Sequence, residues 1–129
     1  MNKRSLFALL VLESTAALLL SCGGSPNQDC SPLGLVISPA NGTADHAAVA
    51  PGNQVQYSGM EQLPPGCAQT ALVPILTWTT SDTVNTSITN APGSTPGTAT
   101  CISATPQPAT ITGSLPGGSL KGTATLTCK

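Results

Sequence analysis

The chain has 129 residues, of which only 4 are Lys or Arg and 5 are Asp or Glu, so its net charge at pH 7 is -1. Nucleic-acid binding requires a cluster of Lys and Arg side chains, whereas here Lys3 and Arg4 lie at one end of the sequence and Lys121 and Lys129 near the other. Stacking on bases or sugars uses several aromatic side chains, but the chain contains one Trp, one Tyr and one Phe. The composition therefore argues against both of these binding functions.

The N-terminus has the order of an export signal. Lys3 and Arg4 precede an apolar stretch over residues 6–20, and a positive region followed by an apolar stretch is typical of a secretory signal peptide. A helix that crosses the hydrocarbon core of a bilayer needs about 20 apolar residues. Because this stretch has 15, a cleaved signal is favoured over a retained transmembrane helix.

The apolar stretch ends in Leu19-Leu20-Ser21-Cys22, which resembles the lipobox of bacterial lipoproteins. Leu19 stands three places before the cysteine, and the small Ser21 stands immediately before it. The resemblance implies that residues 1–21 are removed and that Cys22 carries lipid, which anchors the protein to a membrane because more than one acyl chain gives stable attachment. The alternative is an ordinary signal peptide followed by an incidental cysteine.

Cleavage before Cys22 leaves 108 residues, enough for one small domain and a tether. Residues 22–29 are small and polar, as expected of a flexible tether, and residues 30–129 form the domain. Gly23, where an Asp would retain the protein in the inner membrane, implies transfer to the outer membrane of the bacterial cell envelope. The lipoprotein resemblance leaves open whether the domain faces the periplasm or the cell surface.

The domain is predicted to be all-β. Short runs rich in Thr, Val, Ile and Leu alternate with Gly, Pro and Asn clusters, and no amphipathic helix is evident. Strands are expected over 33–38, 53–59, 74–80, 83–89, 98–103, 109–115 and 120–128, with a hairpin turn at 116–119. About seven short strands separated by regular turn signals indicate a β-sandwich.

The period-2 pattern also assigns side chains to faces of these strands. In the last strand Ala124, Leu126 and Cys128 are expected to point inward. Two further pairs are expected to share a face, and these are Leu76 with Trp78 and Val84 with Ile88.

Apart from Cys22, the chain has an even set of four cysteines, Cys30, Cys67, Cys101 and Cys128. Four cysteines in an exported chain predict two disulfides, for which three pairings are possible. The alternative is a four-thiolate zinc site. Structural zinc usually binds cysteines in pairs two to four residues apart, whereas the gaps here are 37, 34 and 27 positions. The spacing therefore favours disulfides, and no metal is expected.

Four segments together resemble the bacterial immunoglobulin-like (Big-type) domains of envelope and adhesin proteins. They are ISPAN at 37–41, VAPGNQVQY at 49–57, TWTTSD at 77–82 and GTATLT at 122–127. The resemblance spans about 95 residues and implies an immunoglobulin-like sandwich of about seven strands. The chain departs from the family in its four cysteines and in a longer loop over 60–73.

The implied sandwich topology selects one of the three disulfide pairings. In such a fold the start of the first strand lies at the same end as the loop between the second and third, so Cys30 pairs with Cys67. The opposite end holds the C-terminus of the last strand and the connection before the sixth, so Cys101 pairs with Cys128. Chain-entropy reasoning predicts that each bond stabilises the fold by about 3.5 to 4 kcal/mol.

Single residues of types that could act in catalysis or bind a ligand are mostly given structural interpretations. Trp78 in mid-strand is expected to pack in the core. His46 and Asp45 are adjacent on an extended segment and therefore point apart, which indicates a solvated loop pair. Asp82 is expected to cap a turn, and the scattered acids argue against a calcium site. With one His and no carboxylate pair, the chain lacks the usual catalytic groups, so neither enzyme activity nor a cofactor is expected.

Two functions of different classes remain. The favoured one is a non-catalytic, lipid-anchored envelope lipoprotein that acts as a structural, protein-binding or adhesion module, through a sheet edge or through its loops. Its partner would be an envelope or extracellular protein. The alternative is a small secreted inhibitor or ligand-capture protein whose active element is the proline-bearing loop 62–74, held by Cys67.

Overall fold

The computed structural model describes residues 28–68, 73, 75–91 and 95–129. The predicted signal peptide, the lipidation site Cys22 and most of the tether over 22–29 lie outside these residues, as does part of the loop 62–74. Among the described residues, no helix is long and apolar enough to cross a membrane.

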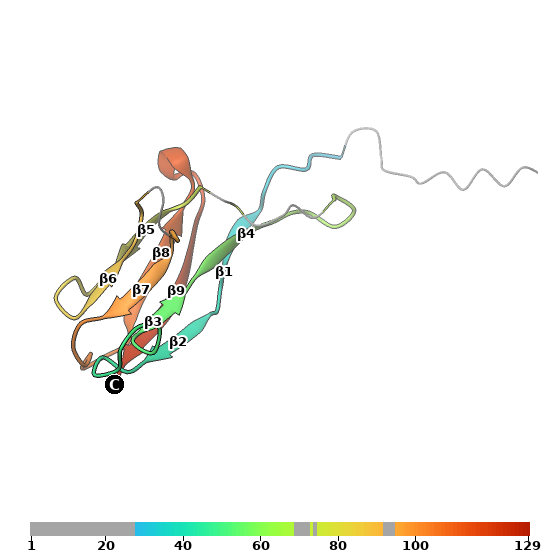
Figure 1. Cartoon of the computed structure of the whole chain (residues 1–129). Helices are drawn as coiled ribbons and strands as arrows, with labels where there is room; N and C mark the ends of the chain where they lie inside the picture. Colours follow the sequence, from blue (N-terminus) through green and yellow to red (C-terminus); the bar gives the residue numbers. More distant parts are fainter. Residues whose placement is uncertain (1–27, 69–72, 74, 92–94) are drawn as a thin grey trace, which may run out of the picture.

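The described part of the chain is mostly β-structure (Figure 1). Its nine strands are β1 (Gly34–Ser38), β2 (Asn41–Ala44), β3 (Gln54–Gln56), β4 (Ser58–Gln62), β5 (Thr77–Thr80), β6 (Thr86–Ile88), β7 (Thr98–Cys101), β8 (Ala109–Ser114) and β9 (Lys121–Cys128). One short 3-10 helix, η1 (Pro116–Gly118), connects β8 to β9. These elements agree with the predicted all-β class and are compatible with a sandwich.

The strands form three hydrogen-bonded groups, in the orders β2-β9-β8-β5, β3-β7-β6 and β1-β4. Only Tyr57 separates β3 from β4, and its N–H donates to the Gly97 carbonyl at 2.9 Å. The β1-β4 pair therefore extends the sheet that contains β3 and β7. All strand pairs are antiparallel except β2 with β9, which is parallel. The chain thus passes from one sheet to the other at Pro39 and Ala40, between β1 and β2.

A single core contains buried side chains from both sheets. Trp78 is 4% exposed and Tyr57 1%, so both large aromatic residues of the domain lie inside. The smaller members include Leu35 and Ile37 of β1, Ala99 of β7, Ile111 of β8, and Ala124 and Leu126 of β9. Burial of these apolar surfaces is the main force that holds the two sheets together.

The strongest sequence pattern is confirmed in β9. Ala124, Leu126 and Cys128 are buried, as alternation predicted, and Leu76 shares the inward face with Trp78. Near the start of the same strand, Gly122 lies against β1. A Cβ added at Gly122 would stand 2.3 Å from the Leu35 carbonyl oxygen, so only glycine allows this close approach.

Several details of the sequence prediction are wrong, and the strands expected over 74–80 and 98–103 are confirmed only at Thr77–Thr80 and Thr98–Cys101. Asn41 and Gly42, which lie between the strands expected over 33–38 and 53–59, begin strand β2, because they pair in register with Thr125 and Leu126 of β9. The strand expected over 83–89 begins only at Thr86, and Val84 is 77% exposed because it lies in the preceding turn. The strand expected over 53–59 continues to Gln62, where it pairs with β1.

Candidate functional site

A groove of about 420 Å³ lies between β5 and β6. β5 is the last strand of its four-stranded sheet and β6 the last of its three-stranded sheet, so edges of both sheets meet at the groove. Its lining residues are uncharged, and they are Trp78, Thr79, Thr80, Thr83, Thr86, Ser87 and Ile88. We therefore take this uncharged groove, called here the β5–β6 groove, as the candidate binding surface.

Two threonines join the walls of the groove. The hydroxyl oxygens of Thr80 and Thr86 lie 2.6 Å apart, and the Thr86 hydroxyl donates to the Asp82 carbonyl oxygen at 2.5 Å. Because Thr86 has only one hydroxyl proton, Thr80 is the donor between them. Thr86 is 1% exposed and its polar group is satisfied, which makes the floor of the groove a fixed structural feature.

Asp82 shapes the turn that leads into β6. One of its carboxylate oxygens, Oδ1, accepts the backbone N–H groups of Val84 and Asn85 at 3.2 and 3.0 Å, and Oδ2 accepts from the Asn85 side chain at 2.8 Å. The side-chain and then the backbone hydrogen bond from Asn85 hold the pKa of Asp82 below its ordinary value. Asp82 thus caps a turn, as the sequence predicted, and this turn keeps Val84 out of the strand.

Asn90 covers the free edge of β5. Its Oδ1 accepts the Trp78 backbone N–H at 2.6 Å, and its Nδ2 donates to the Trp78 carbonyl oxygen at 2.8 Å. A neighbouring antiparallel strand makes this same pair of bonds to one residue. The Asn90 side chain is exposed to solvent, so the outer edge of β5 is closed at Trp78 by a group that lies at the surface.

The four cysteines form the two pairs that the sandwich topology implies. Cys30 bonds to Cys67 with a Cα–Cα distance of 5.8 Å, and Cys101 bonds to Cys128 with a distance of 5.6 Å. Their environments differ. Cys101 and Cys128 are 2% and 3% exposed and belong to the core, whereas Cys30 is exposed and Cys67 half-buried.

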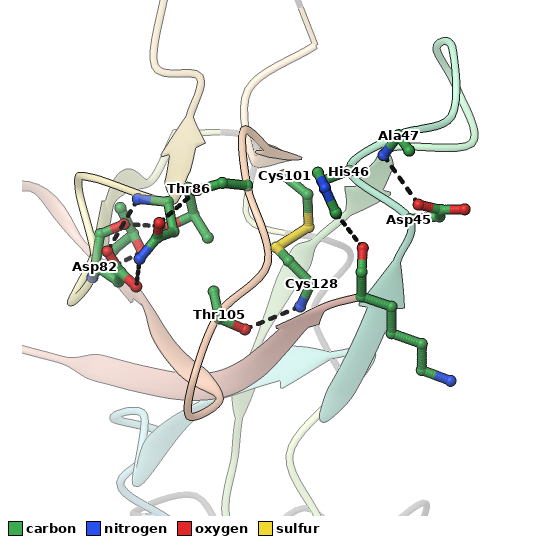
Figure 2. Close-up of a disulfide and its surroundings, with 12 residues drawn as sticks. Asp45, His46, Ala47, Asp82, Thr86, Cys101, Thr105 and Cys128 are labelled. Atoms are coloured by element: carbon green, nitrogen blue, oxygen red, sulfur yellow. Dashed lines mark hydrogen bonds between the residues drawn. A yellow bond between two sulfur atoms is a disulfide. The ribbon is translucent and has the colours of Figure 1, made fainter.

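Figure 2 shows the buried disulfide and the residues around it. The Cys128 N–H donates to the Thr105 hydroxyl at 3.0 Å. His46 contacts the Lys129 carbonyl oxygen through its ring, while Asp45 accepts the Ala47 N–H at 2.9 Å. Asp45 and His46 therefore bond to different backbone groups and do not act on one another.

The titratable residues of the described chain do not gather into a metal site. Among residues 28–68, 73, 75–91 and 95–129, no group of three or more His, Cys, Asp or Glu side chains is placed to hold an ion. Tyr57 is the buried titratable residue of the core. It donates its hydroxyl proton to the Thr125 carbonyl oxygen at 2.7 Å, and burial raises its pKa to about 12.

The loop 62–74 is described only in part, at residues 62–68 and 73. Besides the bond from Cys67 to Cys30, this part is held by Gln28, whose side-chain amide donates to the Pro65 carbonyl oxygen. Pro65 and Gly66 are exposed at the loop surface. The loop is therefore pinned to the segment that precedes β1.

Sequence reasoning missed Asn90 and the threonine pair. Asn90 follows a predicted strand in a stretch rich in turn residues, where an asparagine usually indicates only a turn. Its role depends on β5 lying beside it, which only the tertiary fold determines. Thr86 lies in a predicted strand, but its burial again depends on which strand faces it.

No protein-family model matches this chain, and no curated protein sequence matches it. Neither family nor function therefore follows from sequence similarity.

Proposed function

We propose that the protein is a non-catalytic lipoprotein of the bacterial cell envelope, in which one immunoglobulin-like domain, anchored through lipid on Cys22, binds another envelope or extracellular protein. The lipobox-like residues 19–22 support the anchor. The β5–β6 groove is the observation that carries the binding role, because it combines two sheet edges with an uncharged surface.

The strand order supports the immunoglobulin-like assignment. If β1 with β2 and β3 with β4 are each taken as one interrupted strand, seven strands remain. The first (β1), second (β3 and β4), fourth (β6) and fifth (β7) then form one sheet. The third (β5), sixth (β8) and seventh (β9) form the other, together with β2, the second half of the first strand. This order resembles the constant-type immunoglobulin arrangement, which supports the assignment. Trp78 on the third strand packs in the core, as a tryptophan does at that place in such folds.

Strand addition is the recognition mode that suits this surface. An extended peptide that joins an exposed sheet edge gains main-chain hydrogen bonds, and pockets for its alternate side chains give specificity. The β5–β6 groove offers an edge and a hollow together. Since the described residues that line the groove carry no charge, we expect a partner segment with neutral side chains.

The anchor is tested by lipid labelling. Cells that express the full chain are grown with an alkyne analogue of palmitate, and the purified protein is examined by mass spectrometry. We expect label on a mature N-terminal Cys22 and none in a Cys22→Ser variant. An unlabelled protein that begins at another residue would refute lipidation.

The binding role is tested by crosslinking in intact cells. A photo-crosslinking amino acid is introduced at Ser87, which lines the groove, and in a separate control at Thr123, an exposed residue of β9. We expect one discrete crosslinked partner from Ser87 and none from Thr123. Equal crosslinking from both positions would contradict a specific surface at the groove.

A second candidate function is inhibition or ligand capture by the loop 62–74. The observation that favours it is the pinning of this loop by Cys67 and Gln28, which leaves Pro65 and Gly66 exposed. A held, exposed loop binds with less loss of conformational entropy than a free one. Replacement of residues 63–66, 68 and 69 by Gly and Ser, with Cys67 kept, should abolish such an activity and leave crosslinking from Ser87 unchanged.

A further inference from the structure

The side chain of Asn90 places a carboxamide where a neighbouring strand would place a peptide group. We propose that Asn90 is a displaceable cover, and that an extended polypeptide segment of a partner protein takes over its two hydrogen bonds to Trp78 and lies along the β5–β6 groove. This inference rests on the proposed binding function and names its edge and the chemistry of its partner.

Strand geometry shows that the covered edge of β5 faces away from β8. The Ser81 N–H donates to the Thr110 carbonyl at 2.9 Å, on the side where β5 pairs with β8. Successive residues of a strand turn their N–H and C=O groups to opposite edges. Trp78 and Thr80 therefore turn these groups away from β8, and at Trp78 they meet Asn90 at 2.6 and 2.8 Å.

The cover can be exchanged for a strand without losing hydrogen bonds. A carboxamide and a peptide group offer the same donor and acceptor, so the two bonds to Trp78 are replaced one for one. Asn90 is exposed, so its amide finds water when it leaves. An added strand also reaches Thr80, the next outward residue, and its side chains fill the groove of about 420 Å³.

A polypeptide fits this surface better than a sugar. Sugars stack on exposed aromatic faces, whereas Trp78 is only 4% exposed. The amide that occupies the edge offers the same donor and acceptor as a peptide group, which is why we infer a polypeptide as the ligand.

The test uses the full chain, purified in mild detergent, with a defined probe. The probe is a capped, neutral pentapeptide, acetyl-Thr-Val-Thr-Val-Thr-amide, and its control carries proline at the central position, which removes a donor and disfavours pairing. Binding is followed by fluorescence of Trp78, the only tryptophan in the sequence. We expect Asn90→Ala to bind the pentapeptide about tenfold more tightly than the native chain, because the competing cover is gone, and a tenfold change corresponds to about 1.4 kcal/mol.

Asn41→Ala is the matched control variant. Asn41 is an exposed asparagine of β2 with one side-chain hydrogen bond, to Thr125, and it does not line the groove. We expect its affinity for the pentapeptide to equal that of the native chain. Equal gains in Asn41→Ala and Asn90→Ala, or equal affinity for the proline peptide, would overturn the proposal.

A second variant keeps the test decisive if Asn90→Ala does not fold. In Asn90→Asp at pH 7 the carboxylate still accepts the Trp78 N–H but cannot donate to the Trp78 carbonyl, so we expect an affinity between those of the native chain and Asn90→Ala. No gain in any folded Asn90 variant refutes the displaceable cover. A fluorescence change with a neutral oligosaccharide and none with the pentapeptide would assign the groove to sugars. None of these results depends on lipid at Cys22, so failure here is distinguishable from failure of the anchor.

Discussion

The two disulfides lie in opposite kinds of surroundings. Cys101–Cys128 joins the end of β7 in one sheet to the end of β9 in the other, and both residues are within the core. Cys30–Cys67 lies outside the core, just before β1 and just after β4, two strands that already pair with each other. One bond therefore connects the sheets, whereas the other closes a surface loop beside an existing ladder.

Loop length alone predicts that the outer bond stabilises the fold slightly more than the buried one. The surroundings of the two bonds favour the opposite order. Their sequence separations are 37 and 27 residues, for which the chain-entropy model gives about 3.8 kcal/mol for the outer bond and about 3.6 kcal/mol for the buried one. The outer cysteines, however, flank exposed segments that gain freedom in the folded state when the bond is absent. Removal of the buried bond also leaves poorly filled space in the core. We therefore expect the buried bond to stabilise the fold more.

The largest loss of stability is expected when the buried bond is removed. Cys101→Ala combined with Cys128→Ala should lower the free energy of unfolding by about 4 kcal/mol, measured by urea denaturation with circular dichroism. A loss smaller than that of the outer double variant would reverse the comparison and restore loop length as the deciding factor.

The next effect tests whether the end of the molecule near Cys30 is held by packing. Gly122→Ala should lower the free energy of unfolding by about 2 to 3 kcal/mol, because the new Cβ would lie 2.3 Å from the Leu35 carbonyl oxygen and push β1 from β9. Gly117→Ala is the control. Gly117 has a φ of 81° but open space around it, so we expect about 1 kcal/mol from backbone strain alone. Equal losses would show that β1 is not packed tightly at this point.

A smaller effect is expected at the outer bond itself. Cys30→Ala combined with Cys67→Ala should lower the free energy of unfolding by about 1 to 2 kcal/mol, below the chain-entropy value, because the freed segments are exposed in the folded state. Hydrogen exchange should rise in residues 28–33 and 63–68 and stay unchanged in β7 and β9. Faster exchange throughout the core would contradict this local role.

The smallest effect concerns a second link between the sheets. Tyr57→Phe removes the hydrogen bond to Thr125 of β9 and should cost about 1 kcal/mol, measured under the same urea conditions. Thr83→Ala, a change in the exposed turn before β6, serves as the control and should cost less. A loss above that of the buried double variant would make this hydrogen bond, and not the buried disulfide, the main connection between the sheets.

The same tyrosine gives a pH signature. Its pKa is raised from 10 to about 12 in the folded state, so its contribution to stability is complete below pH 10 and is lost as the pH rises to 12. Tyr57 is the only tyrosine in the chain, so its phenolate absorbance reports it alone. We expect a midpoint near 12 in the folded protein and near 10 in urea. A midpoint near 10 in both would show that the side chain is not buried.

The sequence predicts elements well where one strand carries its own pattern. Ala124, Leu126 and Cys128 alternate with threonines, and Trp78 is in phase with Leu76, so their inward faces follow from period 2 alone. β2 was missed because Asn41 and Gly42 have turn-forming chemistry, and only the parallel partner β9 makes them a strand. Val84 was misplaced because the hydrogen bonds of Asp82 form a turn that overrides the apolar pattern.

The candidate site was less predictable than the fold for a similar reason. The β5–β6 groove exists because edge strands of two different sheets lie side by side. Asn90 matters because it reaches the backbone of a residue 12 positions earlier. No local pattern encodes such contacts. The two cysteine pairs could be anticipated only after a topology was assumed, because spacing alone left three pairings open.

The outer disulfide also determines how mechanical load enters the domain. Tension applied from the N-terminal side reaches Cys30 before it reaches β1, and the bond to Cys67 passes part of it to the segment after β4. The force then acts on both paired strands at their adjacent ends, so the hydrogen bonds between them are not broken one at a time. A domain held to a surface by this side would resist peeling at its first strand, even though the same bond adds less to its equilibrium stability than the buried bond does.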